Sequence, residues 1–198
     1  MTWHRLGRDA DHPAGIARYL ERGDDLYIFV DGTRNNREWR LNFQTLRFRP
    51  WGDKARVSVK DFEQARAVRH ALDDAGVTFV GRRVVIGGYS RGYAIALILA
   101  YDMLDTPYVP TVWGWAGKRA GNRAFMRALE TWEVCTSNLS HRGDIVPYLP
   151  PWYAPTPTVW HSPRMLPHAA HIHAGHQAAR WRHEVTLQIA EQANGGEA

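Results

Sequence analysis

Residues 83–101 constrain the fold more than any other stretch, because a single short turn separates a strand pattern from a helix pattern. Residues 84–86 (Val-Val-Ile) have the β-branched composition of a buried strand. Residues 94–100 are almost continuously apolar, which is typical of a helix buried on most sides. The turn between them, residues 88–92, reads Gly-Tyr-Ser-Arg-Gly and has the form G-x-S-x-G. The sequence therefore predicts a strand, a sharp turn and a helix in immediate succession.

This turn would present Ser90 as a nucleophile. In a nucleophile elbow the serine is held in a strained conformation at the end of a strand, and small residues two positions before and after it let strand and helix approach. A serine hydroxyl attacks a carbonyl only when a base takes its proton and N–H groups receive the oxyanion. The flanking strand and helix are the context that the motif requires, so the pattern predicts a serine hydrolase. The alternative is a glycine-rich turn with an incidental serine.

The 198 residues are predicted to form a single domain, with a proline-rich loop at 151–167 that could cover a site and a frayed tail at 194–198. The one cysteine, Cys135, excludes an internal disulfide and is expected to be a small buried residue in a strand. Residues 1–9 lack the apolar core of a secretion signal, and the longest apolar run is too short to cross a bilayer. We therefore expect a soluble protein that is made in the cytoplasm and is released, if at all, by lysis or a specialised secretion route.

The formal net charge of +5 does not by itself indicate a nucleic-acid partner. The basic residues are dispersed along the chain without a block of five like charges, and dispersed charges usually form a solvated face. We therefore expect no nucleic acid as a partner. Peripheral contact with lipid stays open, because nine tryptophans are many for this length and one or two of them could face a lipid or a ligand.

Hydrophobic periodicity and turn residues predict helices and strands in alternation. Along the chain, the expected elements are a helix at 9–23, strands at 25–31 and 41–48, a helix from 58 or 61 to 75, the strand and helix around Ser90, a strand at 108–115, a helix at 121–130, a strand at 131–137 and a final helix from about 174 to 192. This order indicates an α/β domain built in layers.

Two polar residues follow predicted strands. Asp144 lies in a loop just after a predicted strand and after the serine in the chain, where the acid of a catalytic triad is expected. Thr33 follows the strand at 25–31, where the second donor of an oxyanion hole is expected. For Thr33 an alternative is equally open, since Gly32 and Asn35 could merely turn the chain.

Three segments carry a family likeness beyond any single motif. Residues 30–33 (Val-Asp-Gly-Thr), 115–125 (Trp-Ala-Gly-Lys-Arg-Ala-Gly-Asn-Arg-Ala-Phe) and 144–151 (Asp-Ile-Val-Pro-Tyr-Leu-Pro-Pro) stand in matching order around the Ser90 turn. Together they resemble the class 3, or fungal-type, lipases over roughly residues 25 to 152. The resemblance implies an α/β-hydrolase fold, in which a central, mostly parallel sheet is flanked by helices.

The resemblance also implies roles for individual residues. Ser90 corresponds to the nucleophile and Asp144 to the triad acid, while Thr33 and the backbone amide of Arg91 correspond to the oxyanion hole. The reaction implied is cleavage of a small-molecule or lipid ester without a cofactor.

The base of the triad must lie after the acid, and several histidines are available. In class 3 lipases the histidine lies in a loop just before the last helix and is followed by an aromatic residue, a description that His176 matches best. His173 and His171 are the alternatives, because a small shift of the helix boundary would exchange them. Together with His168 these histidines also have spacing that could hold a metal, but no carboxylate or cysteine joins them locally, so we expect no metal site.

Departures from the family pattern leave the substrate open. Asp31, Lys118 and Asn42 stand where the family usually has an arginine, a proline and an acid. The Asp-Gly-Thr sequence at 31–33 and the arginine after Ser90 also look like the phospholipase-like effectors of bacteria. Both likenesses imply ester cleavage. The sequence shows no long apolar lid helix between the first strands and the Ser90 turn, and this favours smaller or more exposed esters as substrates. The rival interpretation is a non-catalytic protein that keeps the fold and binds nucleic acid or anionic lipid through a basic surface.

Overall fold

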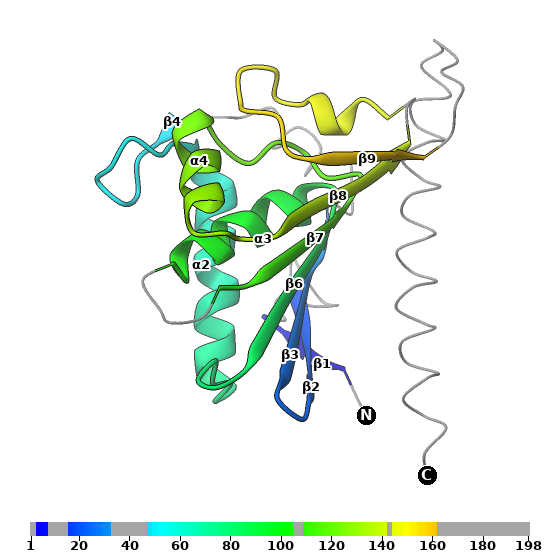
Figure 1. Ribbon diagram of the computed structural model, residues 1–198. Coiled ribbons are helices and arrows are strands. Elements are labelled where there is room, and N and C mark those ends of the chain that lie inside the picture. Colours follow the sequence, from blue (N-terminus) through cyan, green and yellow to red (C-terminus); the bar gives the residue numbers. More distant parts are fainter. Residues whose placement is uncertain (1–2, 8–15, 33–46, 105–108, 142–143, 162–198) are drawn as a thin grey trace.

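A seven-stranded sheet forms the centre of the molecule in a computed structural model that describes residues 3–7, 16–32, 47–104, 109–141 and 144–161 (Figure 1). Its strands are β1 (His4–Leu6), β2 (Ala17–Arg22), β3 (Asp25–Val30), β6 (Arg83–Tyr89), β7 (Thr111–Trp115), β8 (Thr136–His141) and β9 (Thr158–His161), and they lie side by side in that order. The strands from β3 to β9 pair in parallel, and β1 and β2 add an antiparallel edge. The mostly parallel sheet predicted from the sequence is therefore confirmed.

Three helices, α2 (Val59–Asp74), α3 (Arg91–Asp102) and α4 (Arg123–Thr131), lie on one side of this sheet (Figure 1). The short 3-10 helix η1 (Val146–Tyr148) follows β8. The helix α3 packs on β3, β6 and β7, and α2 packs against α3. Every residue of α3 from Arg91 to Ala100 is buried, as the apolar run predicted. A small second sheet pairs β4 (Arg47–Phe48) with β5 (Val57–Ser58), and β5 leads directly into α2.

The start and end of α2 follow from its sequence. Ser58 is the N-cap, and its side-chain oxygen accepts a hydrogen bond from the backbone N–H of Asp61. Ala65, Val68 and Leu72 form a fully buried stripe at helical spacing. Beyond the last turn Gly76 adopts a φ of +70°, a left-handed conformation that glycine accepts without strain. The prediction of a helix from 58 or 61 to 75 thus matches α2 closely.

The helix predicted at 9–23 is wrong in its described part, because Ala17–Arg22 form the strand β2. Ile16, Tyr19 and Leu20 fit a helical spacing, but this short segment gains more by pairing antiparallel with β3 over six residue pairs. The turn between the two strands passes through Gly23, with a φ of +55°. Residues 8–15 lie outside the described residues.

The strand predicted at 131–137 begins later than expected. The helix α4 continues to Thr131, Glu133 takes a left-handed φ of 55°, and β8 starts only at Thr136. Cys135 therefore precedes the strand and is exposed, so the prediction of a buried strand cysteine is wrong. Trp132 is the C-cap of α4, and its N–H donates to the Ala128 carbonyl. The turn that ends α4 therefore contains residues that were predicted to begin the strand.

The stretch at 151–167 was predicted to be a proline-rich loop, but part of it is regular. The strand β9 lies within it and extends the sheet. Pro157 precedes β9 and uses only its carbonyl, which accepts from the N–H of Asn138 on the neighbouring strand. Residues 162–167, the predicted helix at 174–192, the tail at 194–198 and most of the strand predicted at 41–48 lie outside the described residues. In the described ranges no helix is long and apolar enough to cross a membrane.

Candidate active site

Ser90 lies in the tight turn between β6 and α3, and its backbone has an unusual conformation. Its φ of 56° and ψ of −119° are rare for a residue with a side chain, and such conformations persist only where the surroundings enforce them. Two neighbours do so: the Ser90 N–H donates to the Trp115 carbonyl at 2.9 Å, and the Ser90 carbonyl accepts from the Lys118 N–H at 3.2 Å. Strand, strained serine and helix follow one another as the G-x-S-x-G pattern requires.

The two glycines of the motif are required by close packing. A Cβ atom at Gly88 would lie 2.3 Å from the carbonyl carbon of Gly92, and one at Gly92 would lie 2.3 Å from the Val30 carbonyl oxygen. Real Cβ atoms do not approach backbone this closely, so any side chain here would force strand and helix apart. The backbone geometry that a nucleophile elbow requires is therefore present, with Ser90 itself buried at 1% exposure.

Asp144 follows β8, two strands away from the serine in the sheet order. Its carboxylate is 1% exposed and accepts two hydrogen bonds, from the Val146 N–H at 2.9 Å and from the Ser140 hydroxyl at 3.2 Å. Neighbouring strands are about 4.8 Å apart, so the ends of β6 and β8 are separated by roughly 10 Å. An imidazole bridging the serine and the acid would fit across the end of β7.

Gly32, two residues after β3, lies directly against the elbow. A Cβ atom at Gly32 would lie 2.5 Å from the Tyr89 carbonyl oxygen and 3.3 Å from the Ser90 Cβ. Asp31, which stands where the family usually has an arginine, forms an ion pair with Arg18 on β2 at 3.3 Å. The structure thus brings the end of β3, the elbow and the end of β8 to one edge of the sheet.

The remaining predicted site residues lie outside the described residues. These are the oxyanion candidate Thr33 and the histidines His171, His173 and His176, together with His168 of the proposed metal alternative. Within the described ranges no group of three His, Cys, Asp or Glu residues could hold a metal ion.

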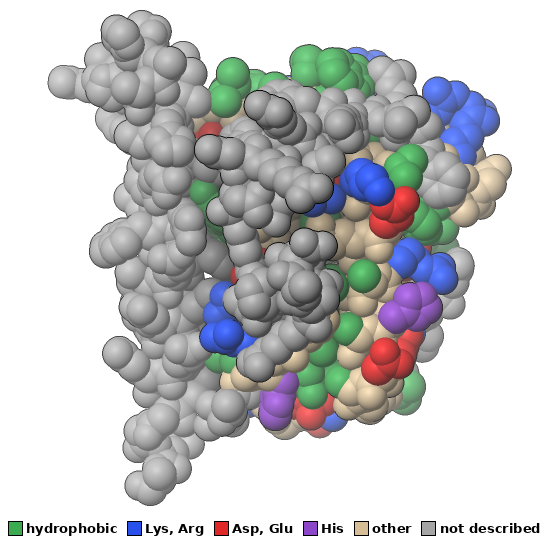
Figure 2. All heavy atoms as spheres, turned by 180° about the vertical axis from the view of Figure 1, so that it is seen from behind, with side chains coloured by type: hydrophobic (Ala, Val, Ile, Leu, Met, Phe, Trp, Pro, Cys, Tyr) green, Lys and Arg blue, Asp and Glu red, His purple; other side chains and the backbone are tan. Residues whose placement is uncertain are grey.

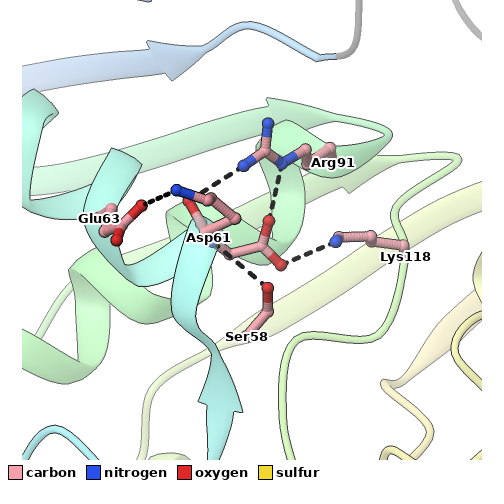
Figure 3. A network of polar contacts seen from close by, with 6 residues as sticks. Ser58, Asp61, Glu63, Arg91 and Lys118 are labelled. Atoms are coloured by element: carbon pink, nitrogen blue, oxygen red, sulfur yellow. Dashed lines mark hydrogen bonds and ion pairs between the residues drawn. The ribbon is translucent and has the colours of Figure 1, made fainter. Parts of the chain in front are cut away.

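A buried ion cluster beneath the elbow went unrecognised in the sequence (Figure 3). The Asp61 carboxylate contacts the Arg91 Nε at 2.7 Å through one oxygen and the Lys118 Nζ at 2.7 Å through the other. The exposed fractions of the three side chains are 1% for Asp61, 10% for Arg91 and 4% for Lys118. Two signals could have pointed to it, namely the arginine directly after the serine and the lysine in place of the family's proline.

The cluster perturbs the ionisation of its members. Burial opposes the charge on Asp61, but the positive charges of Lys118 and Arg91 outweigh this and hold the pKa of the carboxyl below its usual range. Burial, reinforced by the charge of Arg91, holds the pKa of the Lys118 ammonium below its ordinary value despite the attraction of Asp61. With all three groups ionised, the cluster has one surplus positive charge.

A buried asparagine fixes the loop that supports the serine from the other side. Asn138 on β8 accepts from the Gly117 N–H at 2.9 Å and donates to the Gly117 carbonyl at 3.1 Å. This pairing holds the loop that directly follows Trp115, the last residue of β7, whose carbonyl accepts from the Ser90 N–H. This role could not be predicted from the sequence, because a single asparagine in a strand pattern has no distinctive spacing.

The described surface shows no strong segregation of charge in the view from behind. Figure 2 shows basic and acidic side chains interspersed over the described part of this face, with apolar side chains between them. Exposed apolar side chains also follow Asp144, where Ile145, Tyr148 and Trp152 are between 43% and 49% exposed. In Figure 1 the 3-10 helix η1 of this segment lies near the end of the sheet toward which β6, β7 and β8 run.

Comparisons with known proteins agree with this geometry. Residues 27–154 match the model of the family described as Lipase (class 3). Among solved structures, a lipase from Rhizopus microsporus var. chinensis is similar with a TM-score of 0.63 and 21% identity, over 74% of this chain and 57% of that one. The triacylglyceride lipase of Rhizomucor miehei gives a TM-score of 0.61 and 20% identity, over 73% and 60% of the two chains.

A third structure, of a triacylglycerol lipase whose catalytic centre is described as a serine protease triad, gives a TM-score of 0.60 and 22% identity, over 73% of this chain and 60% of that one. At these identities the structural likeness shows the fold, which is that of the α/β-hydrolases. The chain spans 57% to 60% of the length of these three lipases.

Proposed function

Because this chain belongs to the class 3 lipase family, we propose that it is a serine hydrolase that cleaves carboxylic esters. The observation that carries the proposal is the strained backbone of Ser90, enforced by glycines that admit no side chain. Strain of about 1–3 kcal/mol at a single residue is retained where the conformation has a use, and orienting a nucleophile toward its base and its substrate is such a use.

In the proposed mechanism His176 takes the proton of the Ser90 hydroxyl as its oxygen attacks the ester carbonyl. The developing oxyanion is received by the backbone N–H of Arg91 and by Thr33. The carbon–oxygen bond to the alcohol then breaks, and the imidazolium returns the proton to the leaving oxygen. Water, deprotonated by the same histidine, releases the acid and restores the serine.

Asp144 is the proposed partner of the histidine. Its two hydrogen bonds fix the carboxylate, and its burial would strengthen the interaction with an imidazolium. His173 and His171 are the alternative bases. The choice rests on sequence alone, and His176→Ala, His173→Ala and His171→Ala compared side by side would identify the base as the one whose loss abolishes turnover.

Thr33 is the proposed second oxyanion donor, and two observations support it. Gly32, which precedes it, contacts the elbow, and Arg91 directly follows the serine, so its N–H is at the start of α3. Donors on both sides of the serine are the arrangement that stabilises a tetrahedral intermediate.

The proposed substrates are esters with an apolar acyl group, from a small molecule or a lipid. The exposed side chains of Ile145, Tyr148 and Trp152 follow the acid directly and offer an apolar surface near the same edge of the sheet. Lipid esters are the substrates that the family name implies. Activity on soluble short-chain esters as well as on lipid vesicles is expected, since the sequence shows no long apolar lid helix ahead of the elbow.

Labelling with a fluorophosphonate, read by intact mass, tests the proposal. The wild type is expected to gain one adduct, and Ser90→Ala is expected to gain none, because only an activated serine attacks phosphorus at a useful rate. A folded wild type that takes up no label and hydrolyses no ester would contradict the proposal. It would favour the non-catalytic binding protein instead.

A further inference from the structure

One buried carboxylate, that of Asp61, contacts two residues that are each connected to the proposed nucleophile Ser90. Asp61 contacts the side chain of Arg91, which directly follows Ser90, and the side chain of Lys118, whose backbone N–H donates to the Ser90 carbonyl. Figure 3 shows the three side chains converging from α2, α3 and the loop after β7. Asp61 is therefore connected twice to the backbone of a residue that it does not itself touch.

The element that holds Asp61 is firmly anchored. The Arg91 guanidinium also donates to the Lys60 carbonyl at 3.0 Å, so it is fixed to the first turn of α2 by two contacts. The N–H of Asp61 is capped by Ser58, which leaves its carboxylate to the two cations. A displacement of the Asp61 carboxylate would consequently displace the start of α3.

The loop that holds Lys118 is tied to the same region. Val57 forms a backbone bridge with Gly121. Asn122 accepts from the Arg56 N–H at 3.0 Å and donates to the Lys54 carbonyl at 2.9 Å. The chain ahead of α2 and the loop after β7 therefore form one connected support beneath the elbow.

The charges themselves point to positioning rather than to stability. Burying ions costs several kcal/mol each, and a well-packed apolar group of similar volume is often as stable as a buried ion pair. Here one acidic and two basic side chains are buried together, which makes the cluster a poor stabilising device. Directional contacts at 2.7 Å, by contrast, fix orientation in a way that apolar packing does not.

We propose that Asp61 is a positioning residue that holds the Ser90–Arg91 peptide in the orientation needed to receive the oxyanion, an inference that rests on the proposed esterase function. Through Arg91 it fixes the donor N–H, and through Lys118 it fixes the carbonyl side of the serine. The family pattern has a proline where this chain has Lys118, so the cluster is a feature of this chain's own sequence.

The test compares Asp61→Asn with Glu63→Gln, a matched change on the same turn of α2. Glu63 is exposed and pairs only through its carboxylate with the exposed ammonium of Lys60 at 2.7 Å, so its loss is expected to leave turnover unchanged. For Asp61→Asn we expect kcat for a p-nitrophenyl ester to fall about 10- to 100-fold with KM within about twofold, since small displacements of catalytic groups cost this much. The rate of fluorophosphonate labelling is expected to fall in the same ratio.

Hydrogen–deuterium exchange provides a readout that does not depend on activity. Amides in peptides covering residues 88–93 and 115–121 are expected to exchange at least about 10-fold faster in Asp61→Asn, and at the wild-type rate in Glu63→Gln. A folded Asp61→Asn protein with wild-type kcat and wild-type exchange would overturn the proposal. An inactive wild type would refute the proposed function alone, because exchange would still decide whether Asp61 fixes the elbow.

A second variant covers the case in which Asp61→Asn does not fold. Lys118→Met removes the surplus positive charge and keeps the contact between Asp61 and Arg91. It is expected to fold, to lower kcat about 3- to 10-fold, and to accelerate exchange in residues 115–121 more than in 88–93. Equal exchange in wild type and Lys118→Met in both peptides would contradict the positioning role.

Discussion

The two ends of the proposed catalytic machinery are built in different ways. The turn that carries Ser90 is held by contacts from far along the chain. Val30 on β3 packs closely against Gly92, the Lys118 N–H in the loop after β7 donates to the Ser90 carbonyl, and Asp61 on α2 pairs with Arg91. Asp144 is fixed locally, by a hydroxyl four residues before it and an N–H two residues after it. Among the described residues, the contacts that hold the serine turn thus come from distant elements, whereas the two described hydrogen bonds of the acid come from its own turn.

This difference has a physical reason. The serine must hold a left-handed backbone conformation that is unfavourable by itself, so several elements have to enforce it. A carboxylate in an ordinary loop conformation needs only donors that satisfy its oxygens. We expect substitutions around the elbow to affect stability and activity together, and substitutions around the acid to act mainly on activity.

The largest effect is expected from Ser90→Gly, which removes the nucleophile and the strain at once. Turnover should fall about 10⁶-fold, as when a triad serine is deleted, while the free energy of unfolding should rise by about 1 kcal/mol because glycine tolerates a positive φ. Ser90→Ala is the control, since it removes the hydroxyl and keeps the strain. Urea unfolding of both variants separates the two effects, and equal stability of the two would mean that the elbow is not strained.

The next largest effect is expected from Gly88→Ala. Its methyl group would lie 2.3 Å from the backbone of Gly92, so we expect a loss of about 3 kcal/mol in the free energy of unfolding, measured by urea denaturation. Gly81→Ala provides the matched control, because it has a φ of +74° but open space around its Cβ position, and should cost only about 1 kcal/mol. Similar losses for the two variants would mean that the helix and strand can separate at little cost.

The sequence predicted the elbow well because its signals are local. Three consecutive features, the β-branched run, the G-x-S-x-G turn and the apolar helix, each report the structure of their own residues. Asp144 was predicted as the triad acid from a similar signal, since it follows a strand at a recognisable position, and this role stays a prediction. The alternation of elements indicated a layered α/β domain, and the mostly parallel sheet followed from the resemblance to the class 3 lipases.

The supporting contacts could not be predicted in this way. Asp61 and Lys118 are 57 residues apart in the sequence and meet only because α2 and the loop after β7 pack together. The strand β2 was mistaken for a helix because pairing with β3 decides its conformation, and pairing is not written in its own spacing. β9 was missed because prolines around it masked a four-residue strand that the sheet edge stabilises.

The smallest effect is expected from Ser140→Ala, at the locally built end of the site. The Ser140 hydroxyl donates to Asp144 at 3.2 Å in a buried setting, so its loss should cost about 1 kcal/mol of stability and lower kcat about 3- to 10-fold through a less constrained carboxylate. Ser137→Ala, a half-buried position on the same strand β8, is the control and should change neither the stability nor kcat.

Hydrogen exchange at the elbow gives a second readout of Ser140→Ala. Because the effect of Ser140 is expected to stay within its own turn, exchange in residues 88–93 should remain at the wild-type rate, in contrast to Asp61→Asn. Faster exchange at the elbow in Ser140→Ala would show that the acid and the serine share one support, and the distinction between a global and a local end of the site would be lost.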